Sequence, residues 1–215
     1  MEQLKIIRFV FNMLGVNTYL LFDESTREAI IIDAACYSHD ESERLHQYIT
    51  QNGLHPTRLL NTHLHFDHIF GNRFIYDHYG LKPEAHPADE DWLLEAKQRT
   101  RMFGLEFPGE TIALGHYLAD GEKIETGGMA LTAIHIPGHS AGSLVFYEEK
   151  QQVLFTGDVL FNGSVGRADL PGGDMNLLVK GIREHLTNLP HETLVLPGHG
   201  EPTTIGEELT HNPYL

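Results

Sequence analysis

The sequence contains a single cysteine, Cys36, among its 215 residues, which excludes a disulfide framework within the chain. No apolar run approaches the roughly 20 residues that a membrane-spanning helix needs. The first residues, MEQLKIIRFVFN, lack the basic start, long apolar core and small-residue cleavage site of a signal peptide. These absences predict a cytoplasmic protein that does not associate with a membrane.

Basic residues are also scarce. The chain has 15 Lys and Arg against 30 Asp and Glu, a formal net charge of −15. Such a chain repels phosphate backbones and shows no basic stripe, so no nucleic-acid partner is expected. An anionic substrate would need local positive charge at its binding site. Histidine, in contrast, is abundant at 15 residues, which indicates a metal centre.

Short apolar strands alternate with amphipathic helices along the chain. Strands are predicted at residues 5–11, 17–23, 28–35, 56–63, 129–138, 142–149, 151–158 and 193–200. Helices are predicted at residues 38–53, 69–80, 87–104 and 175–190, with a short helix at the C-terminus. The two rounds of strands and helices each end in loops that carry His or Asp. This order predicts an α/β (α+β) fold, an αββα sandwich of two mixed sheets flanked by helices, in one domain of residues 1–215.

The segment NTHLHFDHIFGN, residues 61–72, places three histidines and an aspartate within six residues. It follows a predicted strand, and alternate residues of an extended segment share a side, so His63 and His65 can act together. If the chain turns into a helix at Asp67 and His68, that pair points in another direction. The segment therefore fits two adjacent pairs of metal ligands rather than one four-fold site. Imidazole and carboxylate suit zinc, and also iron or manganese.

Three later loops share one design, a buried strand followed by a short turn that contains glycine. AIHIPGHSAG provides His139, VLFTGDVLF provides Asp158, and LVLPGHGEP provides His199. Glycine beside each candidate ligand lets the backbone approach a crowded metal ion. Together with the first segment, these loops provide seven candidate ligands, enough for a pair of metal ions.

The ordered motifs THLHFDH, PGHS, TGD and PGHG resemble those of the metallo-β-lactamase superfamily, and within it the glyoxalase II-like hydroxyacylglutathione hydrolases. The resemblance covers essentially the whole chain and implies the metallo-β-lactamase fold. It implies two divalent metal ions per chain, zinc first, with iron or manganese as alternatives. The implied ligands are His63, His65 and His139 for one ion, Asp67, His68 and His199 for the other, and Asp158 as the bridge between them.

A metal pair of this kind predicts hydrolysis. Two cations about 3.5–4 Å apart lower the pKa of a shared water and stabilise the attacking and departing atoms. A metal-bridging hydroxide would attack the carbonyl of an acyl thioester, with Asp67 and Asp158 as the catalytic carboxylates. The resemblance implies a small glutathione thioester such as S-D-lactoylglutathione as substrate, cleaved to a 2-hydroxy acid and glutathione in methylglyoxal detoxification.

Two further residues are predicted near this centre. Asp33 ends the apolar strand AIIIDA and is expected to accept a hydrogen bond from a metal-bound histidine, with a turn residue as the alternative. Arg167 stands where the family has a basic residue that meets glutathione, and a guanidinium suits a carboxylate. The alternative is a surface ion pair between Arg167 and Asp169. Where many relatives have Gly-Cys-Gly, this chain has the longer sequence GSVG at residues 163–166.

The resemblance leaves other functions open. Glutathione persulfide dioxygenases are similar in sequence, including the segment GRADLPGGD, but hold one Fe(II); the corresponding ligands are His63, His139 and Asp158. Lactone and β-lactam hydrolases of the superfamily form a third class. Sixteen residues follow His199, too few for the helical extension of the longer glyoxalase II enzymes, which predicts a short, single-domain branch.

Overall fold

The computed structural model describes residues 4–215, in which two six-stranded sheets account for most of the strands. The strands of the first sheet are β1 (Leu4–Phe11), β2 (Val16–Asp23), β3 (Glu28–Ile32), β4 (His55–Leu60), β5 (Pro83–Ala85) and β6 (His116–Tyr117). Those of the second are β7 (Lys123–Thr126), β8 (Met129–His135), β9 (Leu144–Glu148), β10 (Val153–Gly157), β13 (Leu194–Pro197) and β14 (Thr203–Thr204). A separate hairpin joins β11 (Leu160–Phe161) to β12 (Ser164–Val165).

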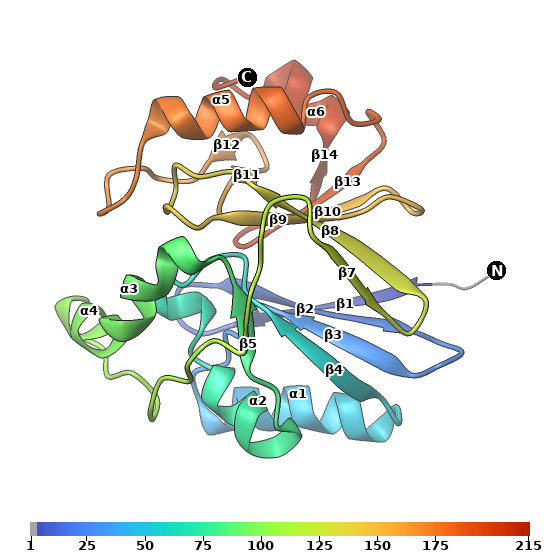
Figure 1. The fold of residues 1–215 in the computed structure, drawn as a ribbon, viewed down its shortest axis with the longest axis vertical. Helices are drawn as coiled ribbons and strands as arrows, with labels where there is room; N and C mark the ends of the chain where they lie inside the picture. The colour runs from blue at the N-terminus through green and yellow to red at the C-terminus, as the bar shows by residue number, and fades with distance from the viewer. Residues whose placement is uncertain (1–3) are drawn as a thin grey trace.

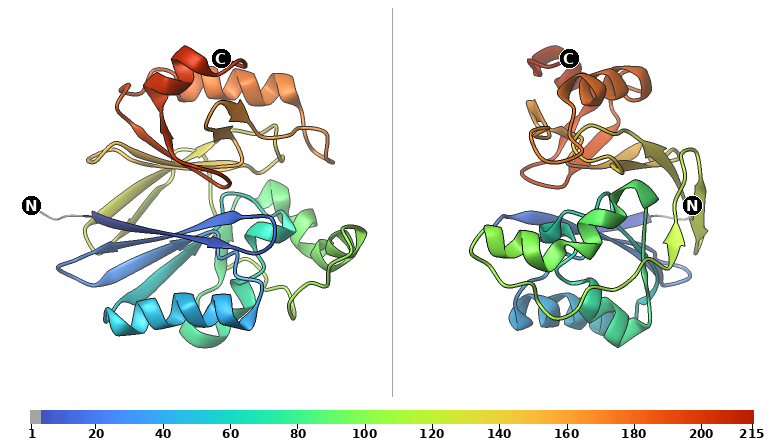
Figure 2. Two further views of the ribbon diagram at one scale, coloured as in Figure 1. Left: turned by 180° about the vertical axis from the view of Figure 1, so that it is seen from behind. Right: turned by 60° about the vertical axis from the view of Figure 1, so that its left-hand side comes forward.

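The helices are α1 (His39–Gln51), α2 (Asn72–Tyr79), α3 (Glu90–Leu94), α4 (Ala96–Met102), α5 (Met175–His185) and α6 (Ile205–His211), with 3-10 turns η1 (Phe66–His68) and η2 (Pro87–Asp89). In Figure 1, α1 and α2 cover the outer face of the first sheet, and α5 and α6 cover the outer face of the second. Figure 2 shows the same layers from two other sides, with α3 and α4 beside one end of the sheets. Both sheets contain parallel and antiparallel pairs. The predicted αββα sandwich of two mixed sheets is confirmed.

Burial on both faces explains why the central strands are apolar almost throughout instead of alternating. In β3, Ile30 belongs to the core cluster between the two sheets, whereas Ile31 belongs to the cluster beneath α1. Leu45 and Ile49 of α1 complete this second cluster. On the other side of the molecule, Ile182 of α5 packs in a third cluster against the second sheet. These three apolar clusters fix the two sheets and their helices relative to one another. The loops at the strand ends are therefore anchored on a rigid support.

Some predicted boundaries are wrong. The predicted helix at residues 87–104 is divided into η2, α3 and α4: Asp89 (φ −100°, ψ 4°) separates η2 from α3, and Glu95 (φ −96°, ψ 2°) separates α3 from α4. Helical hydrogen bonds nevertheless continue across this residue, from Glu95 N to Asp91 O and from Arg99 N to Glu95 O. The prediction is therefore right in type and wrong in continuity. The short strands β5, β6 and β7 were not predicted, since segments of two to four residues carry too little pattern.

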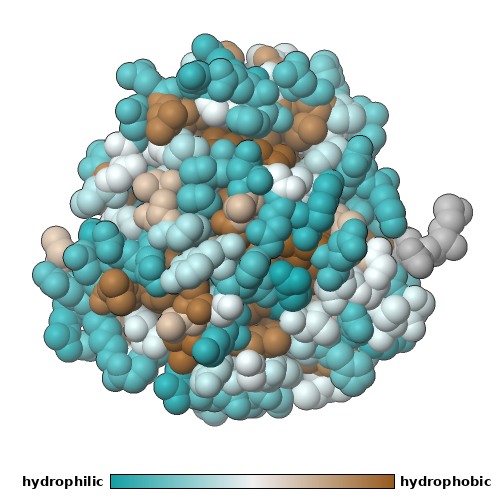
Figure 3. All heavy atoms as spheres, in the orientation of Figure 1, coloured by the Kyte–Doolittle hydropathy of each residue, from teal (hydrophilic) through white to brown (hydrophobic). Residues whose placement is uncertain are grey.

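The surface in Figure 3 is mostly hydrophilic, with hydrophobic side chains visible on the side where α3 and α4 lie. Leu94, Met102 and Phe103, in and just after these helices, are exposed apolar residues. Within residues 4–215, no helix combines the length and the apolar character that crossing a membrane requires.

Candidate metal centre

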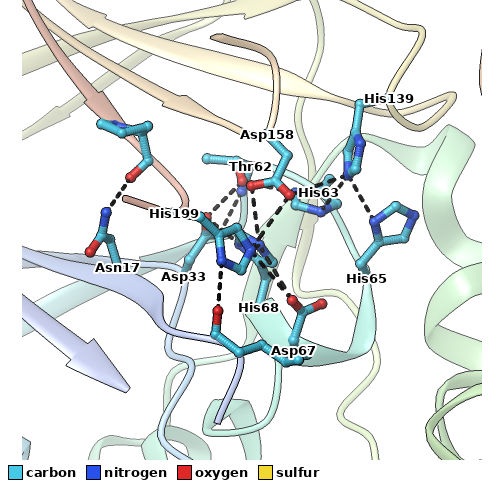
Figure 4. A network of polar contacts seen from close by, with 12 residues as sticks. Asn17, Asp33, Thr62, His63, His65, Asp67, His68, His139, Asp158 and His199 are labelled. Atoms are coloured by element: carbon cyan, nitrogen blue, oxygen red, sulfur yellow. Dashed lines mark hydrogen bonds and ion pairs between the residues drawn. The ribbon is translucent and has the colours of Figure 1, made fainter. Parts of the chain in front are cut away.

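The candidate ligands follow strands that end at one edge of the sandwich. Residues 63–68 follow β4, and Asp33 follows its parallel neighbour β3. In the other sheet, Asp158 follows β10 and His199 follows its parallel neighbour β13, while His139 comes from the loop after β8. Figure 4 shows the side chains from both halves of the chain pointing toward one another.

The structure brings all seven candidate ligands together. Donor atoms within 4.8 Å of one another form three groups among residues 4–215: His63 with His65 and His139, His63 with His68 and Asp158, and Asp67 with His68 and His199. The first and third groups have the same members as the two ligand sets predicted from sequence. The two predicted pairs of the opening segment fall into separate groups but are close neighbours, since the ring centroids of His63 and His68 lie 4.2 Å apart.

Asp158 lies between the two predicted ligand sets. Its Oδ1 is 3.4 Å from His68 Nε2, and its Oδ2 is 3.6 Å from the Nε2 atoms of both His139 and His199. A single carboxylate therefore faces histidines of each set. This placement is compatible with the bridging role predicted for Asp158.

In four of the five histidines, the ring nitrogen that points away from the centre lies within hydrogen-bond distance of an acceptor. The pairs are His68 Nδ1 with Asp33 Oδ2 (3.0 Å), His139 Nδ1 with the Arg167 carbonyl (2.8 Å), His199 Nδ1 with the Leu14 carbonyl (3.1 Å), and His63 Nδ1 with Thr62 Oγ1 (3.1 Å). An Nδ1 that donates its proton outward leaves Nε2 with a lone pair directed inward. Such partners are the usual support of metal-bound imidazoles.

The inward nitrogens lie close to one another. His139 Nε2 is 2.9 Å from His65 Nδ1 and 3.2 Å from His63 Nε2, and His68 Nε2 is 3.3 Å from His199 Nε2. Lone pairs that face each other at these distances repel unless a cation or a proton lies between them. The geometry therefore fits positive charge at two places.

One buried acceptor of the centre also lacks a hydrogen-bond partner. Within residues 4–215, Asp158 Oδ1 accepts no hydrogen bond, although His68 Nε2 lies 3.4 Å away. A buried acceptor without a partner is costly, and such atoms in native proteins usually mark a functional site or a bound ion. The donor set, histidine nitrogen and carboxylate oxygen, suits zinc, iron or manganese. The residues therefore fit the predicted pair of divalent metal ions.

The charges of the centre are those of a metal-binding site. Burial and the neighbouring His139 lower the pKa of His65 to about 3, so this imidazole is neutral at physiological pH. Burial by itself raises the pKa of Asp158, but the adjacent imidazole of His68, together with the charges of His139 and His199, outweighs burial, and the pKa lies well below its usual range. The pKa of Asp67 is lowered too: burial raises it, but the charge of His68 and the hydrogen bond and charge of His199 together outweigh burial. Both carboxylates are therefore ionised.

His68 shows how strongly this place attracts a cation. Burial lowers the pKa of its imidazole, but the carboxylates of Asp158, Asp33 and Asp67 outweigh burial and raise that pKa well above its ordinary value. Without another cation, the ring holds two protons: Nδ1–H faces Asp33, and Nε2–H faces Asp158 and Asp67. A divalent metal ion bound at Nε2 would replace the second of these protons.

Asp33 is a buried residue that ties the ligand segment to β3. Its Oδ1 accepts a hydrogen bond from the Thr62 backbone N–H at 2.8 Å, and its Oδ2 accepts one from the Thr62 hydroxyl at 2.7 Å. The backbone of Asp33 is in the left-handed region, with φ 52°, and the Thr18 hydroxyl binds its carbonyl at 2.5 Å. Such an unusual conformation persists where the surroundings over-determine it. Its predicted role behind a metal-bound His68 stays a prediction.

Glycine allows the loops to approach the centre closely. A Cβ added to Gly198 would lie 2.3 Å from Asp158 Oδ1 and 2.8 Å from His68 Cε1. No side chain fits at such distances, so the PGHG loop needs glycine at this position for steric reasons.

Arg167 combines the two alternatives predicted for it. Its side chain lines the cavity above the centre, while its guanidinium makes two hydrogen bonds of 2.7 Å with Asp169 at the surface. Its carbonyl also accepts the hydrogen bond from His139 described above. A substrate would have to draw the guanidinium away from Asp169.

A cavity of about 400 Å³ opens onto the centre, a volume typical of sites for small molecules. Its lining divides into candidate ligands, apolar walls and two arginines. The apolar walls are Leu14, Phe66, Trp92, Met102, Phe103, Leu170 and Pro171. The two arginines are Arg99 and Arg167.

Asp89 is a buried residue at the end of η2 that the sequence did not indicate as part of the site. It accepts hydrogen bonds from the Leu64 N–H (3.2 Å), the Ser140 hydroxyl (2.7 Å) and the Gly142 N–H (2.6 Å). Leu64 lies between two candidate ligands, and Ser140 follows a third. Asp89 thus joins two ligand loops that are far apart in the sequence, which no local pattern could reveal. Trp92 and Arg99 were missed too: they are seven residues apart on one face of the predicted helix at 87–104, but the local sequence does not show that this face borders the centre.

Comparison with known proteins agrees with this geometry. The model of the Metallo-beta-lactamase superfamily matches residues 12–199. Hydroxyacylglutathione hydrolase GloC of Haemophilus influenzae is 34% identical over 200 residues, which cover 93% of this chain and 92% of that protein. The probable metallo-hydrolase YqgX of Bacillus subtilis is 35% identical over 192 residues, covering 86% of this chain and 90% of that protein.

Solved structures are similar along nearly the whole chain. The BLEG-1 B3 metallo-beta-lactamase has a TM-score of 0.89 and 34% identity, covering 98% of this chain and 99% of that one. TTHA1623 in a di-iron-bound form has a TM-score of 0.85 and 35% identity, covering 97% and 100%. ETHE1 from Myxococcus xanthus has a TM-score of 0.79 and 25% identity, covering 97% and 83%.

Proposed function

Because this chain belongs to the metallo-beta-lactamase superfamily, we propose that it is a metal-dependent hydrolase of acyl thioesters. The proposed substrate is a small glutathione thioester such as S-D-lactoylglutathione, cleaved to a 2-hydroxy acid and glutathione. The similarity to hydroxyacylglutathione hydrolase GloC, at 34% identity over most of both chains, supports this substrate class.

The observation that supports the proposal is the presence of two compact groups of donor atoms, with the Asp158 carboxylate facing histidines of both. In the second group, Asp67 with His68 and His199, the donor atoms lie within 4.8 Å of one another, as they do in the first group. A hydrolase with two metal ions uses both sets. The di-iron form of TTHA1623, which is 35% identical, supports two ions in this chain as well. Zinc, iron and manganese are all compatible with the donors.

His63, His65 and His139 would hold one ion and Asp67, His68 and His199 the other, with Asp158 between them. When bound, two divalent cations supply a water of lowered pKa and positive charge for the carbonyl oxygen.

The chain's own groups orient the reaction. The ionised Asp67, whose Oδ2 lies 3.5 Å from His199 Nε2, is placed to accept a hydrogen bond from the attacking water and so to direct it at the carbonyl carbon. A C–O bond forms, the C–S bond breaks, and a proton passes to the departing sulfur. The apolar walls of the cavity exclude bulk water from the thioester. Arg167 is proposed to bind a carboxylate of the glutathione half.

A second candidate function is a mononuclear Fe(II) glutathione persulfide dioxygenase. The segment GRADLPGGD favours it, and its ligands would be His63, His139 and Asp158, with His139 Nε2 3.2 Å from His63 Nε2 and 3.6 Å from Asp158 Oδ2. A β-lactam hydrolase is a third candidate, supported by the 34% identity to the BLEG-1 B3 metallo-beta-lactamase.

The test combines metal content with two activities. Metal ions per chain are counted on the purified protein by elemental analysis. Hydrolysis of S-D-lactoylglutathione and oxygen uptake with glutathione persulfide are measured on the same sample. We expect two metal ions per chain and thioester hydrolysis. One iron per chain with persulfide-dependent oxygen uptake would contradict the proposal and favour the dioxygenase.

The variant His199→Ala separates these outcomes further, because His199 belongs to the second donor set alone. Removal of one ligand should lower metal content toward one ion per chain and reduce thioester hydrolysis by at least ~100-fold. A dioxygenase that uses His63, His139 and Asp158 would keep most of its activity in this variant.

A further inference from the structure

Arg99 is a positively charged residue in the cavity wall that the proposed hydrolysis does not use. It lies on α4, with its Cζ 3.7 Å from the centroid of the Trp92 ring. Trp92 in turn lies edge-on to His65, with ring centroids 4.1 Å apart and an interplanar angle of 72°. All three side chains line the cavity. His65, Trp92 and Arg99 are therefore in successive contact, from the candidate metal centre to the guanidinium.

Most N–H donors of the Arg99 guanidinium remain available to a ligand. Its Nη2 pairs with Glu95 Oε2 at 2.6 Å, and among residues 4–215 its Nε is buried without a hydrogen-bond partner. A guanidinium carries five N–H donors in a planar fork that matches a carboxylate. One ion pair leaves most of these donors for a ligand in the cavity.

Arg99 is better placed than Arg167 to bind an anionic group of a ligand. The Arg99 side chain is 20% exposed, against 56% for Arg167, and charges interact more strongly where less water surrounds them. Arg167 is also engaged by both carboxylate oxygens of Asp169, at 2.7 Å each. Stacking on Trp92 restrains Arg99, so less freedom is lost when a ligand binds.

We propose that Arg99, held against Trp92, binds a carboxylate of the substrate and so selects acyl thioesters that carry a carboxylate away from the scissile carbonyl. This inference rests on the proposed thioesterase function. The carboxylate belongs either to the thiol half, as in glutathione, or to the acyl half, as in a monothioester of a dicarboxylic acid. In a chain with a net charge of −15, a basic residue in the cavity is the local charge that such an anion needs.

The kinetic test uses three thioesters with Arg99→Gln. S-D-lactoylglutathione carries carboxylates in its thiol half, S-glutaryl-N-acetylcysteamine carries one in its acyl half, and S-D-lactoyl-N-acetylcysteamine is neutral. We expect kcat/KM to fall about 10-fold or more for the thioester whose carboxylate Arg99 binds, mainly through KM, because a charge-assisted hydrogen bond is lost. Turnover of the neutral thioester should not change, which also shows that the variant is folded. The anionic thioester that loses activity identifies the half that Arg99 recognises.

Arg101→Gln is the matched control, since Arg101 lies on the same helix with an exposed side chain and does not line the cavity. This variant should match the wild type on all three thioesters. Arg99→Lys keeps the charge without the planar fork, so its kcat/KM for the recognised thioester should fall between those of wild type and Arg99→Gln. An equal loss on all three thioesters in Arg99→Gln, or no loss on any, would overturn the inference.

A binding measurement separates this inference from the proposed function. S-methylglutathione has no thioester, and its dissociation constant is measured by calorimetry on wild type, Arg99→Gln and Arg101→Gln. If the wild type hydrolyses no thioester but Arg99→Gln alone weakens S-methylglutathione binding, the proposed function fails and the carboxylate site stands. If thioesters are hydrolysed and no charge-dependent effect of Arg99 is found, the site fails and the function stands.

Discussion

The carboxylate of Asp33 lies 3.0 Å from Nδ1 of His68, while Nε2 of the same ring faces Asp158. The ring is thus held between a buried carboxylate on one side and the candidate metal centre on the other. A carboxylate in this position fixes the tautomer and the orientation of a metal-bound imidazole and raises its basicity.

Replacing Asp33 with Asn should therefore weaken metal binding by ~10–100-fold. Asn tolerates the φ of 52° at this position, so the backbone can be kept, but its amide nitrogen cannot accept a hydrogen bond. Metal affinity is measured by competition with a chromogenic chelator. Asp23→Asn is the control, because Asp23 is a buried carboxylate at the far end of β2 whose side chain, within residues 4–215, accepts hydrogen bonds only from its own turn, at Ser25 and Thr26. Equal affinities in both variants and in wild type would refute the role given to Asp33.

Gly198→Ala should disturb the centre through sterics alone. The added methyl group would lie 2.3 Å from Asp158 Oδ1 and 2.8 Å from His68 Cε1, so the loop or the ligands must move. We expect the free energy of unfolding to fall by about 1–3 kcal/mol and metal content to drop below that of wild type. Gly206→Ala in α6 is the control, since its added Cβ would meet its nearest neighbour at 3.1 Å, outside the centre. Elemental analysis and denaturant unfolding give the two readouts, and a variant with normal metal content would contradict the prediction.

Asp89→Asn should loosen the connection between two ligand loops. Asp89 accepts three hydrogen bonds from buried donors, and an amide cannot accept all of them. Each donor left unsatisfied costs about 1–3 kcal/mol, so the free energy of unfolding should fall by at least the lower of these values. Asp91→Asn, at an exposed position two residues away, should stay within about 0.5 kcal/mol of wild type. Urea unfolding of both variants decides the matter, and similar midpoints for the two would show that Asp89 has no such role.

The pH dependence of stability should include a contribution from Cys36. Burial raises the pKa of its thiol from 9.0 to about 11. Below the lower value the thiol is protonated in both folded and unfolded chains. As pH rises from 9 to 11, the unfolded chain loses this proton and the folded chain keeps it, so stability is lost over that interval.

Cys36→Ala should remove this part of the pH dependence. Denaturant unfolding of wild type and variant at both ends of the interval measures the difference in slope, which is insensitive to any constant loss of packing. The native thiol should also react with an alkylating reagent far more slowly than the unfolded chain does, because it is 1% exposed. Equal slopes and rapid alkylation of the native protein would contradict a buried, protonated thiol.

Much of this protein could be predicted from local sequence. The αββα sandwich was predicted from apolar strands and amphipathic helices that occur in two successive series along the chain. Such a prediction is possible because burial on one or two faces leaves a periodic pattern of apolar residues in the sequence. The seven candidate ligands were recognised because each stands in a short motif with glycine beside it or in the dense segment at residues 61–72. Their use as metal ligands, and a single domain of residues 1–215, stay predictions.

What the sequence could not provide is which distant residues meet. It determined the types of donor atom and their order, since these depend on neighbouring residues alone. Only the tertiary structure decided that the histidine next to Asp33 is His68, that Asp89 joins two ligand loops, and that Trp92 and Arg99 line the cavity beside His65. These contacts join residues from separate loops or separate elements, and they exist because two sheets pack with their loops at one edge. A one-dimensional pattern holds no record of such proximity, because it is created by the packing of the whole core.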